Sequence, residues 1–257
     1  MRGHSIPRGR TVAIIQARMR SSRLPGKVLK PLQSRPVLLH VIERVRAAAG
    51  VDAVVVATST RPDDDAIEVE ARAARAHCFR GSESDVLERY FQAAKAEGAD
   101  TVVRVTSDCP LYDPALLGRM LTEWNRKRSD GTRVDHFSNC LKRTFPRGLD
   151  VEIFSFEALE KAHREATAPE EREHVTLYMY RHPELFALEN VENAKDLSSL
   201  RWTLDTEDDW RLIEAVYGRL YRPGKIFSTD DVLELIKREP ALALLNAHVA
   251  QKAVKAK

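Results

Sequence analysis

A short segment near the N-terminus gathers side chains that can bind phosphate. Residues 16–27 read QARMRSSRLPGK and offer cations and hydroxyls at Arg18, Ser21, Ser22, Arg23 and Lys27, with Arg20 beside them. Gly26 lets the backbone approach a ligand closely, and Pro25 stiffens the turn. Arginine can hold phosphate oxygens with two N–H groups at once, whereas lysine acts as a point charge. The segment therefore suits a polyphosphate bound at the end of a strand.

The spacing of these residues matches neither of two common phosphate-binding motifs. The pattern G-x-x-x-x-G-K-[ST] needs an earlier glycine and a terminal hydroxyl, and G-x-G-x-x-G is not present either. The residues alone favour a phosphate site, and a solvated basic loop remains the alternative.

An aspartate far along the chain could complete such a site. Asp108 follows the apolar run TVVRVT, whereas a second aspartate, Asp205, follows LRWTL and precedes TEDDW, a position typical of the acidic start of a helix. Magnesium binds few protein carboxylates and completes its shell with phosphate oxygens and water. An acid that follows a strand beside a triphosphate is therefore a candidate magnesium ligand. The alternatives are a turn or helix cap for Asp108 and the acidic start of a helix for Asp205.

The elements that must position these residues alternate between strand and helix in the first half. Buried strands are predicted at 11–17, 52–57, 77–80 and 101–106, and helices at 36–49, 63–76, 84–97 and 113–127, with Ser84 as a helix cap. This alternation indicates βαβ units and an α/β fold, a mostly parallel sheet with helices on both faces. Ligands of such sheets lie beyond the carboxyl ends of the strands, where both the basic segment and Asp108 are expected.

The second half is less regular. Strands are predicted at 135–140, 149–154, 186–191 and 200–204, and helices at 155–167, 169–181, 206–220, 229–238 and 240–254. We expect residues 1–257 to form a single domain, with a flexible basic N-terminus at 1–10 and C-terminal helices in 228–257.

Composition excludes several classes of protein. The chain has 257 residues, 43% of them hydrophobic and 31% charged, with a net charge of +3, which is typical of a globular protein. Residues 1–46 carry eleven Arg or Lys and one acid, but no aromatic residues interleave, so nucleic acid is not the expected partner. No apolar run approaches the ~18 residues of a membrane span, and the N-terminus lacks the apolar core of a signal peptide. Three widely spaced cysteines favour a reducing compartment, so the cytoplasm is expected.

The segment IIQARMRSSRLPGKVLKPL resembles the N-terminal signature of the cytidylyltransferases that activate sugar acids, including the acylneuraminate and 3-deoxy-manno-octulosonate enzymes. A bacterial subgroup linked to spore-coat polysaccharide biosynthesis is the most similar. It shares FRGSESDVLERY, VRVTSDCPLYDP, RGLDVEIFSFEALE, EREHVTLYMY and RWTLDTEDDW, which occur here in that order as far as residue 210. The resemblance implies a Rossmann-like nucleotide-diphospho-sugar transferase fold and a Mg²⁺-dependent transfer of CMP from CTP to an acceptor, with release of pyrophosphate.

The resemblance also implies roles for individual residues. Asp108 and Asp205 would bind the metal and, with Lys27 and Arg18, form the catalytic group. Arg18, Arg23 and Lys27 are the expected phosphate ligands, whereas Arg20 faces solvent. The predicted nucleotide-binding residues are Gln16, Ala17, Arg18, Ser22, Arg23, Gly26, Lys27, Arg80, Ser82, Asp85 and Thr106. The related enzymes usually carry Gln-Gly where this chain has Thr106-Ser107, so cytosine specificity stays open.

The acceptor side rests on two further motifs. Arg147 and Asp150 come from one motif, and Arg172, Glu173 and His174 come from the other. A cation beside an acid or an imidazole suits an acceptor with hydroxyls and an anionic group, such as a sugar acid or a phosphorylated molecule. Related enzymes form dimers, so residues 135–185 are the candidate insertion for acceptor binding and homodimer contact.

Two other functions remain open at this stage. One is a glycosyltransferase of related fold that uses a nucleotide sugar, although the sequence SDC at 107–109 is not the D-x-D motif common there. The other is a non-catalytic nucleotide-binding or nucleic-acid-binding protein that uses the basic N-terminal arm.

Overall fold

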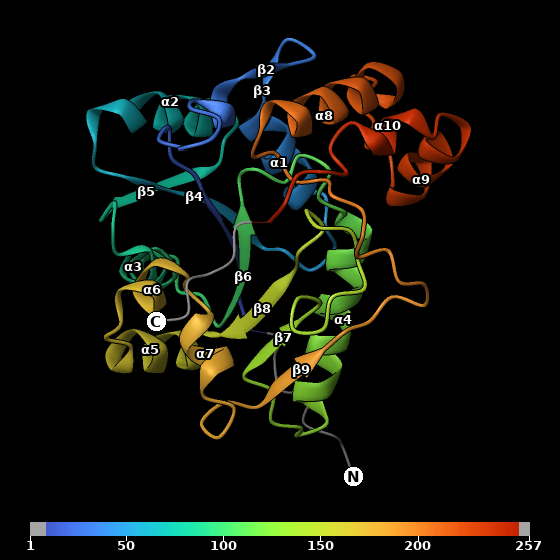
Figure 1. Ribbon diagram of the computed structural model, residues 1–257. Helices are drawn as coiled ribbons and strands as arrows, with labels where there is room; N and C mark the ends of the chain where they lie inside the picture. The colour runs from blue at the N-terminus through green and yellow to red at the C-terminus, as the bar shows by residue number, and fades with distance from the viewer. Residues whose placement is uncertain (1–8, 252–257) are drawn as a thin grey trace.

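The computed structural model describes residues 9–251, and a seven-stranded sheet forms its centre (Figure 1). The strand order is β5-β4-β1-β6-β8-β7-β9, and every pairing is parallel except those of β8 with its two neighbours. The predicted mostly parallel sheet is confirmed. The strands are β1 (Thr11–Gln16), β4 (Ala53–Ser59), β5 (His77–Gly81), β6 (Thr101–Thr106), β7 (His136–Ser138), β8 (Glu152–Ser155) and β9 (Leu188–Asn190), and a small hairpin pairs β2 (Pro31–Leu32) with β3 (Arg35–Pro36).

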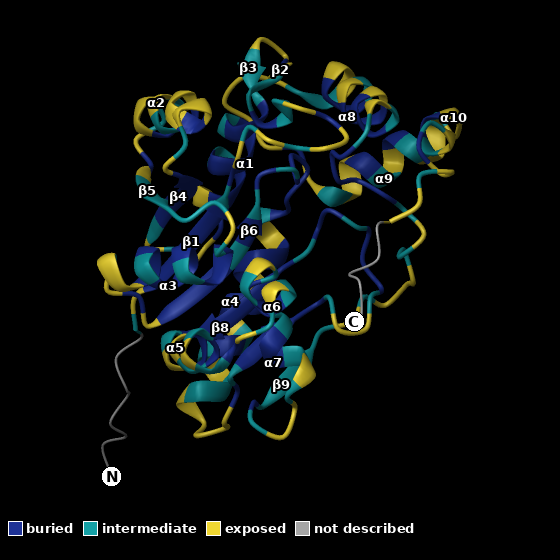
Figure 2. Ribbon diagram, turned by 60° about the vertical axis from the view of Figure 1, so that its left-hand side comes forward, coloured by how far each residue is buried: buried dark blue, intermediate teal, exposed yellow. Residues whose placement is uncertain are grey.

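Helices cover both faces of this sheet because its strands are apolar on both faces. Along β1, Ala13 and Ile15 belong to one buried cluster, and Val12 and Ile14 belong to the other. The first cluster includes side chains of α1 (Val37–Arg46), α2 (Asp65–Ala73), α4 (Pro114–Ser129), α8 (Glu207–Leu220) and α9 (Thr229–Arg238). The second includes side chains of α3 (Val86–Ala96), α5 (Phe156–Glu165) and α7 (Leu177–Arg181). Figure 2 shows the central strands buried between these helices.

The structure differs from the predicted elements mainly in the second half. The predicted helix 169–181 is two short helices, α6 (Pro169–Glu173) and α7, because His174 and Val175 leave helical geometry between them. The predicted strand 200–204 forms only an isolated bridge, between Arg201 and Arg147. Asp85 caps α3 in place of Ser84, through a hydrogen bond from the backbone N–H of Glu88.

The C-terminal part returns to the carboxyl end of the sheet. Helix α9 is followed by α10 (Ala241–Leu244), which is much shorter than the predicted helix 240–254, and residues 252–254 lie outside the described part. The Asn246 side chain donates to the carbonyl of Arg201 and to Asp209, each at 2.8 Å. These bonds hold the segment after α10 against Arg201 and Asp209. Among residues 9–251, no helix has the length and apolar character needed to cross a membrane.

Candidate active site

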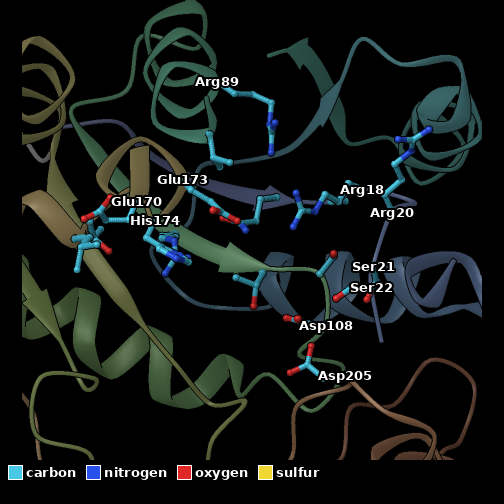
Figure 3. A pocket seen from close by; sticks show the side chains of 18 of the residues that line it. Arg18, Arg20, Ser21, Ser22, Arg89, Asp108, Glu170, Glu173, His174 and Asp205 are labelled. Atoms are coloured by element: carbon cyan, nitrogen blue, oxygen red, sulfur yellow. The ribbon is translucent and has the colours of Figure 1, made fainter. Parts of the chain in front are cut away.

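A cavity of about 880 Å³ opens at the carboxyl ends of β1 and β6 (Figure 3). Its volume is near the upper end for small-molecule sites, so a nucleotide and a second ligand can fit together. The wall comes from the basic loop after β1, the N-terminal turn of α3, the end of β6 and the α6–α7 segment, with Asp205 and Gln251 from the C-terminal half. The predicted site residues that line it are Gln16, Ala17, Arg18, Ser22, Arg23, Lys27, Thr106, Asp108, Glu173, His174 and Asp205.

The basic loop keeps its shape through backbone hydrogen bonds. The N–H of Gly26 donates to the carbonyl of Met19 at 2.9 Å, and the N–H of Met19 donates to the buried carboxylate of Asp64 at 2.8 Å. Gly26 has φ +68°, a left-handed conformation that favours glycine. It lies in a neighbouring, more open hollow with Pro25, not in the main cavity. This turn aims the next residue, Lys27, back across the site.

Lys27 joins the two aspartates that the sequence places 97 residues apart, at 108 and 205. Its Nζ donates to Asp108 Oδ2, to Asp205 Oδ1 and to the carbonyl of Leu204, each at 2.8 Å. Burial alone would raise the pKa of Asp108, but the Lys27 charge and hydrogen bonds outweigh it and lower that pKa to about 2. Burial lowers the pKa of Lys27, but the two carboxylates outweigh it, so the pKa is raised. Lys27 and Asp108 therefore stay ionised near neutral pH.

Asp205 is held by further cations and by the backbone around it. Arg23 and Arg201 each lie 3.0 Å from Asp205 Oδ2. Four residues later, Asp209 accepts hydrogen bonds from the backbone N–H groups of Asp205 and Thr206. Asp209 also completes a capping box at the start of α8. Asp209 therefore shapes the turn, while Asp205 presents its carboxylate to the cavity.

The segment around Gly148 supports this same turn. The backbones of Arg147 and Trp202 are hydrogen bonded at 2.6 Å, and a Cβ on Gly148 would lie 2.6 Å from the carbonyl carbon of Trp202. Glycine is needed at position 148 because the two backbone segments are in direct contact there. Its φ of +106° also favours glycine. Arg147 does not line the cavity, and the carboxylate of Asp150 is paired with Arg143. The structure therefore places Arg147 and Asp150 outside the cavity, in a motif that holds the segment 201–204 leading to Asp205. Their role on the acceptor side stays a prediction.

Four other predicted residues also lie outside the cavity, because each is engaged elsewhere. Arg80 donates to the carbonyls of Ser59 and Arg61 and pairs with Asp65 and Glu68, which ties β5 to α2. The hydroxyl of Ser82 accepts from the N–H of Asp85 at 3.0 Å.

Asp85 and Arg172 are paired with each other. Their shortest contact is 2.6 Å, and Asp85 also caps α3. This ion pair fastens α6 to the start of α3, so it supports the wall that carries Glu173 and His174. The structure gives these four residues internal partners and no position in the cavity. The assignment of Arg80, Ser82 and Asp85 to nucleotide binding and of Arg172 to acceptor binding stays a prediction that this geometry does not support.

The cavity is also lined by polar residues that the sequence did not single out. Arg89, Arg104, Thr176 and Tyr180 all line the cavity, and Arg104 lies in the middle of a buried strand. A charged residue inside the otherwise apolar run TVVRVT is a sequence signal that could have identified Arg104. Burial lowers the pKa of His174, so its imidazole is neutral near pH 7. Arg20 pairs with the exposed Asp63 but also reaches the cavity edge, so it is not purely solvent-facing.

This geometry defines a class of protein: a nucleotide-binding α/β fold with a cationic loop and two convergent carboxylates at one end of the sheet. A family model for cytidylyltransferases matches residues 12–221. The spore coat polysaccharide biosynthesis protein SpsF of Bacillus subtilis is 34% identical over 237 residues, which are 90% of this chain and 95% of that protein. The chain belongs to the cytidylyltransferase family, as the sequence motifs predicted.

Solved structures agree with this assignment. A cytidylyltransferase from Leptospira borgpetersenii is 34% identical and superposes with a TM-score of 0.85, covering 96% of this chain and 100% of that one. A CMP:2-keto-3-deoxy-manno-octonic acid synthetase, solved in complex with CTP, shares the fold with a TM-score of 0.62 at 20% identity, over 82% of this chain and 100% of that one.

Proposed function

We propose that this protein transfers CMP from CTP to a small hydroxylated acceptor that carries an anionic group, a sugar acid or a phosphorylated molecule, and releases pyrophosphate. The observation that carries the proposal lies at the carboxyl ends of β1 and β6. Lys27 pairs there with both Asp108 and Asp205, and Arg23 pairs with Asp205. An acceptor oxygen attacks the α-phosphorus, the bond to the β-phosphate breaks, and the hydroxyl proton passes to water. Negative charge grows on the phosphate oxygens, where fixed cations stabilise it best.

The cations of the loop can pair either with the carboxylates of the site or with the phosphates of a bound nucleotide. Arg18 lines the cavity and forms no ion pair with another described residue, so it can hold a phosphate without breaking one. Arg23 and Lys27 form ion pairs with carboxylates. Both side chains can bind the triphosphate once those carboxylates bind a metal. Gln16, Ala17, Ser22 and Thr106 complete the nucleotide side of the cavity, and Glu173 and His174 face the acceptor.

Magnesium is the proposed cofactor because the donors present fit it. Within the described part of the chain, no group of three or more His, Cys, Asp and Glu side chains could hold a metal by itself. Asp108 and Asp205 nevertheless converge, and Mg²⁺ commonly uses one or two carboxylates together with substrate phosphates. When bound, the ion would neutralise charge on the reacting phosphate and help orient it.

Three wider features belong to the same proposal. We infer a role in cell-surface polysaccharide synthesis because the Bacillus subtilis relative is named for spore coat polysaccharide biosynthesis. A cytoplasmic location follows from the supply of CTP there. A homodimer through residues 135–185 is proposed from the family resemblance, and light scattering on the purified protein tests it.

Pyrophosphate release tests the reaction. The purified protein is incubated with Mg²⁺ and each of the four nucleoside triphosphates across a panel of sugar acids and sugar phosphates. We expect release with CTP and at least one anionic acceptor. If no triphosphate binds and none yields pyrophosphate with any acceptor, the proposed function is wrong.

A further inference from the structure

Arg104 lines the cavity from the middle of β6, four residues before Asp108. It is in β6, with Ile14 of β1 on one side and Glu152 of β8 on the other. Its side chain is 17% exposed and lines the cavity together with His174 and Tyr180. An arginine in the interior of a sheet is unusual because a buried charge needs compensation.

Glu152 provides this compensation and fixes the orientation of the guanidinium. Its carboxylate accepts hydrogen bonds from Arg104 Nη1 and from the Tyr180 hydroxyl. It also accepts from the Thr176 hydroxyl at 2.6 Å and from His136 Nε2 at 3.3 Å. Burial alone would raise the pKa of Glu152, but Arg104 and these hydrogen bonds hold it well below its usual range. Arg104 is therefore a preorganised cation, held from one edge.

The other edge of the guanidinium has no partner within residues 9–251. Nε is buried and makes no hydrogen bond, and Nη2 makes none to a described residue. A buried donor without an acceptor is costly, so this edge is suited to a ligand atom. Two adjacent N–H groups of a guanidinium match two oxygens of a carboxylate or a phosphate.

The neighbouring side chains indicate what else such a ligand carries. His174 lies close enough to Arg104 and Glu173 for both charges to act on its pKa, and its ring makes no hydrogen bond to another described residue. The carboxylate of Glu173 faces the same cavity (Figure 3). An acid and an imidazole beside a cation are suited to a ligand that offers hydroxyl or amino hydrogens next to its oxyanion.

The position of Arg104 also separates this subsite from the metal aspartates. Arg104 precedes Asp108 by four residues on the same strand and its following turn, which spans at most about 13 Å. A sugar acid or sugar phosphate is long enough to place its oxyanion at Arg104 while one hydroxyl lies near Asp108.

We propose that Arg104 is a specificity-determining residue that binds an oxyanion of the acceptor, a carboxylate or a phosphate, through its Nε and Nη2 groups. This proposal rests on the proposed function, because the acceptor is defined by that reaction. The chemistry common to both oxyanions is bidentate recognition by a guanidinium, and the test separates them.

Arginine side-chain NMR on the full-length protein tests the proposal without nucleotide. The Arg104 Nε–H signal is assigned from its loss in Arg104→Lys, and pyruvate, pyruvamide and inorganic phosphate are titrated as probes. We expect the signal to move saturably with pyruvate or with phosphate, and not with uncharged pyruvamide. A stronger response to pyruvate indicates a sugar acid, and a stronger response to phosphate indicates a phosphorylated acceptor. The proposal is overturned if neither anion moves the signal, or if pyruvamide moves it equally.

Variants provide a second readout. Arg104→Gln/Glu152→Gln removes both charges, so it avoids leaving a lone buried carboxylate. We expect this double variant to bind the preferred anion at least tenfold more weakly while the affinity for CTP stays within twofold. The matched control, Arg35→Gln/Glu43→Gln, removes an ion pair of 2.8 Å that lies outside the cavity and should change neither affinity.

Equal anion binding in the double variant and the wild type contradicts the role of Arg104. Absence of CTP-dependent pyrophosphate release contradicts only the proposed function, because the anion titration requires no turnover. The two failures are therefore distinguishable.

Discussion

Replacing Lys27 by methionine should make the stability of this protein depend on a divalent metal. Lys27 is the cation between Asp108 and Asp205, and its side chain is only 11% exposed. Without it, two carboxylates face each other with less compensation. The variant should therefore unfold more easily in EDTA, and a divalent cation that takes the place of the ammonium should restore part of the loss.

The structure gives the size of this effect. The pKa of Asp108 falls from 3.8 to about 2, which corresponds to roughly 2–3 kcal/mol of stabilisation at neutral pH. Breaking a buried ion pair costs about 3–5 kcal/mol in other proteins. We expect a loss near 3 kcal/mol because Arg23 and Arg201 still compensate Asp205. For a chain of this length, that loss lowers Tm by about 6 °C or more.

The assay is thermal unfolding of wild type and Lys27→Met in EDTA and in excess Mg²⁺. Metal at 100 times its Kd adds about 2.7 kcal/mol to a protein that binds it only when folded. Mg²⁺ should therefore raise the Tm of the variant by several degrees and leave the wild type almost unchanged. Lys30→Met is the control, because Lys30 forms a partly exposed pair with Glu207 and should cost less than about 1 kcal/mol. Equal stability of variant and wild type in EDTA would refute the reasoning, as would an equal gain from Mg²⁺.

The other predictions concern the loop, the two aspartates and the turn that supports them. Arg23→Ala should weaken CTP binding more than Arg20→Ala in calorimetry, because Arg23 points at the carboxylates and Arg20 pairs with exposed Asp63; equal losses would contradict this. Asp108→Asn and Asp205→Asn should each lower kcat by about 10²–10³ while the fold is kept, and a change below tenfold would exclude a catalytic role. The stability difference between wild type and Lys27→Met should shrink as pH falls from about 4 towards 2, since a carboxylate with a depressed pKa loses its contribution there. It should also shrink above pH 10.5, the ordinary lysine pKa, where the unfolded chain loses this proton first, and be lost as pH passes the raised pKa of Lys27 in the folded protein. Gly148→Ala should lower the free energy of unfolding by about 2–4 kcal/mol in urea titrations, because the new Cβ meets a backbone carbonyl carbon at 2.6 Å; an unchanged midpoint would show that the two segments can separate.

The sequence predicted the first half of the sheet well because its strands are short apolar runs that end in distinctive polar segments. The side chains of β1 are buried on both faces, and the loop after it could be recognised from its arginines, Pro25 and Gly26. The pairing of Asp108 with Asp205 was predicted only through family resemblance. Their actual link, the Lys27 ammonium, depends on how the chain folds.

The acceptor side was harder to predict because residue type does not reveal which charges are already paired. Arg172 and Asp85 are suited to ligand binding by chemistry, yet they pair with each other over 87 positions of sequence. Arg104 was missed for the opposite reason: it lies in a strand that reads as core. The helix predicted over 169–181 is interrupted at Val175, where φ is +21°, and this break places His174 and Thr176 in the cavity wall.

A crystal structure of the protein soaked with CTP and Mg²⁺ tests the central claim most directly. We predict the triphosphate on the loop of residues 16–27, the metal between Asp108 and Asp205, and Lys27 moved from the carboxylates to a phosphate oxygen. A nucleotide bound elsewhere, with Lys27 still bridging the two aspartates, would contradict the account.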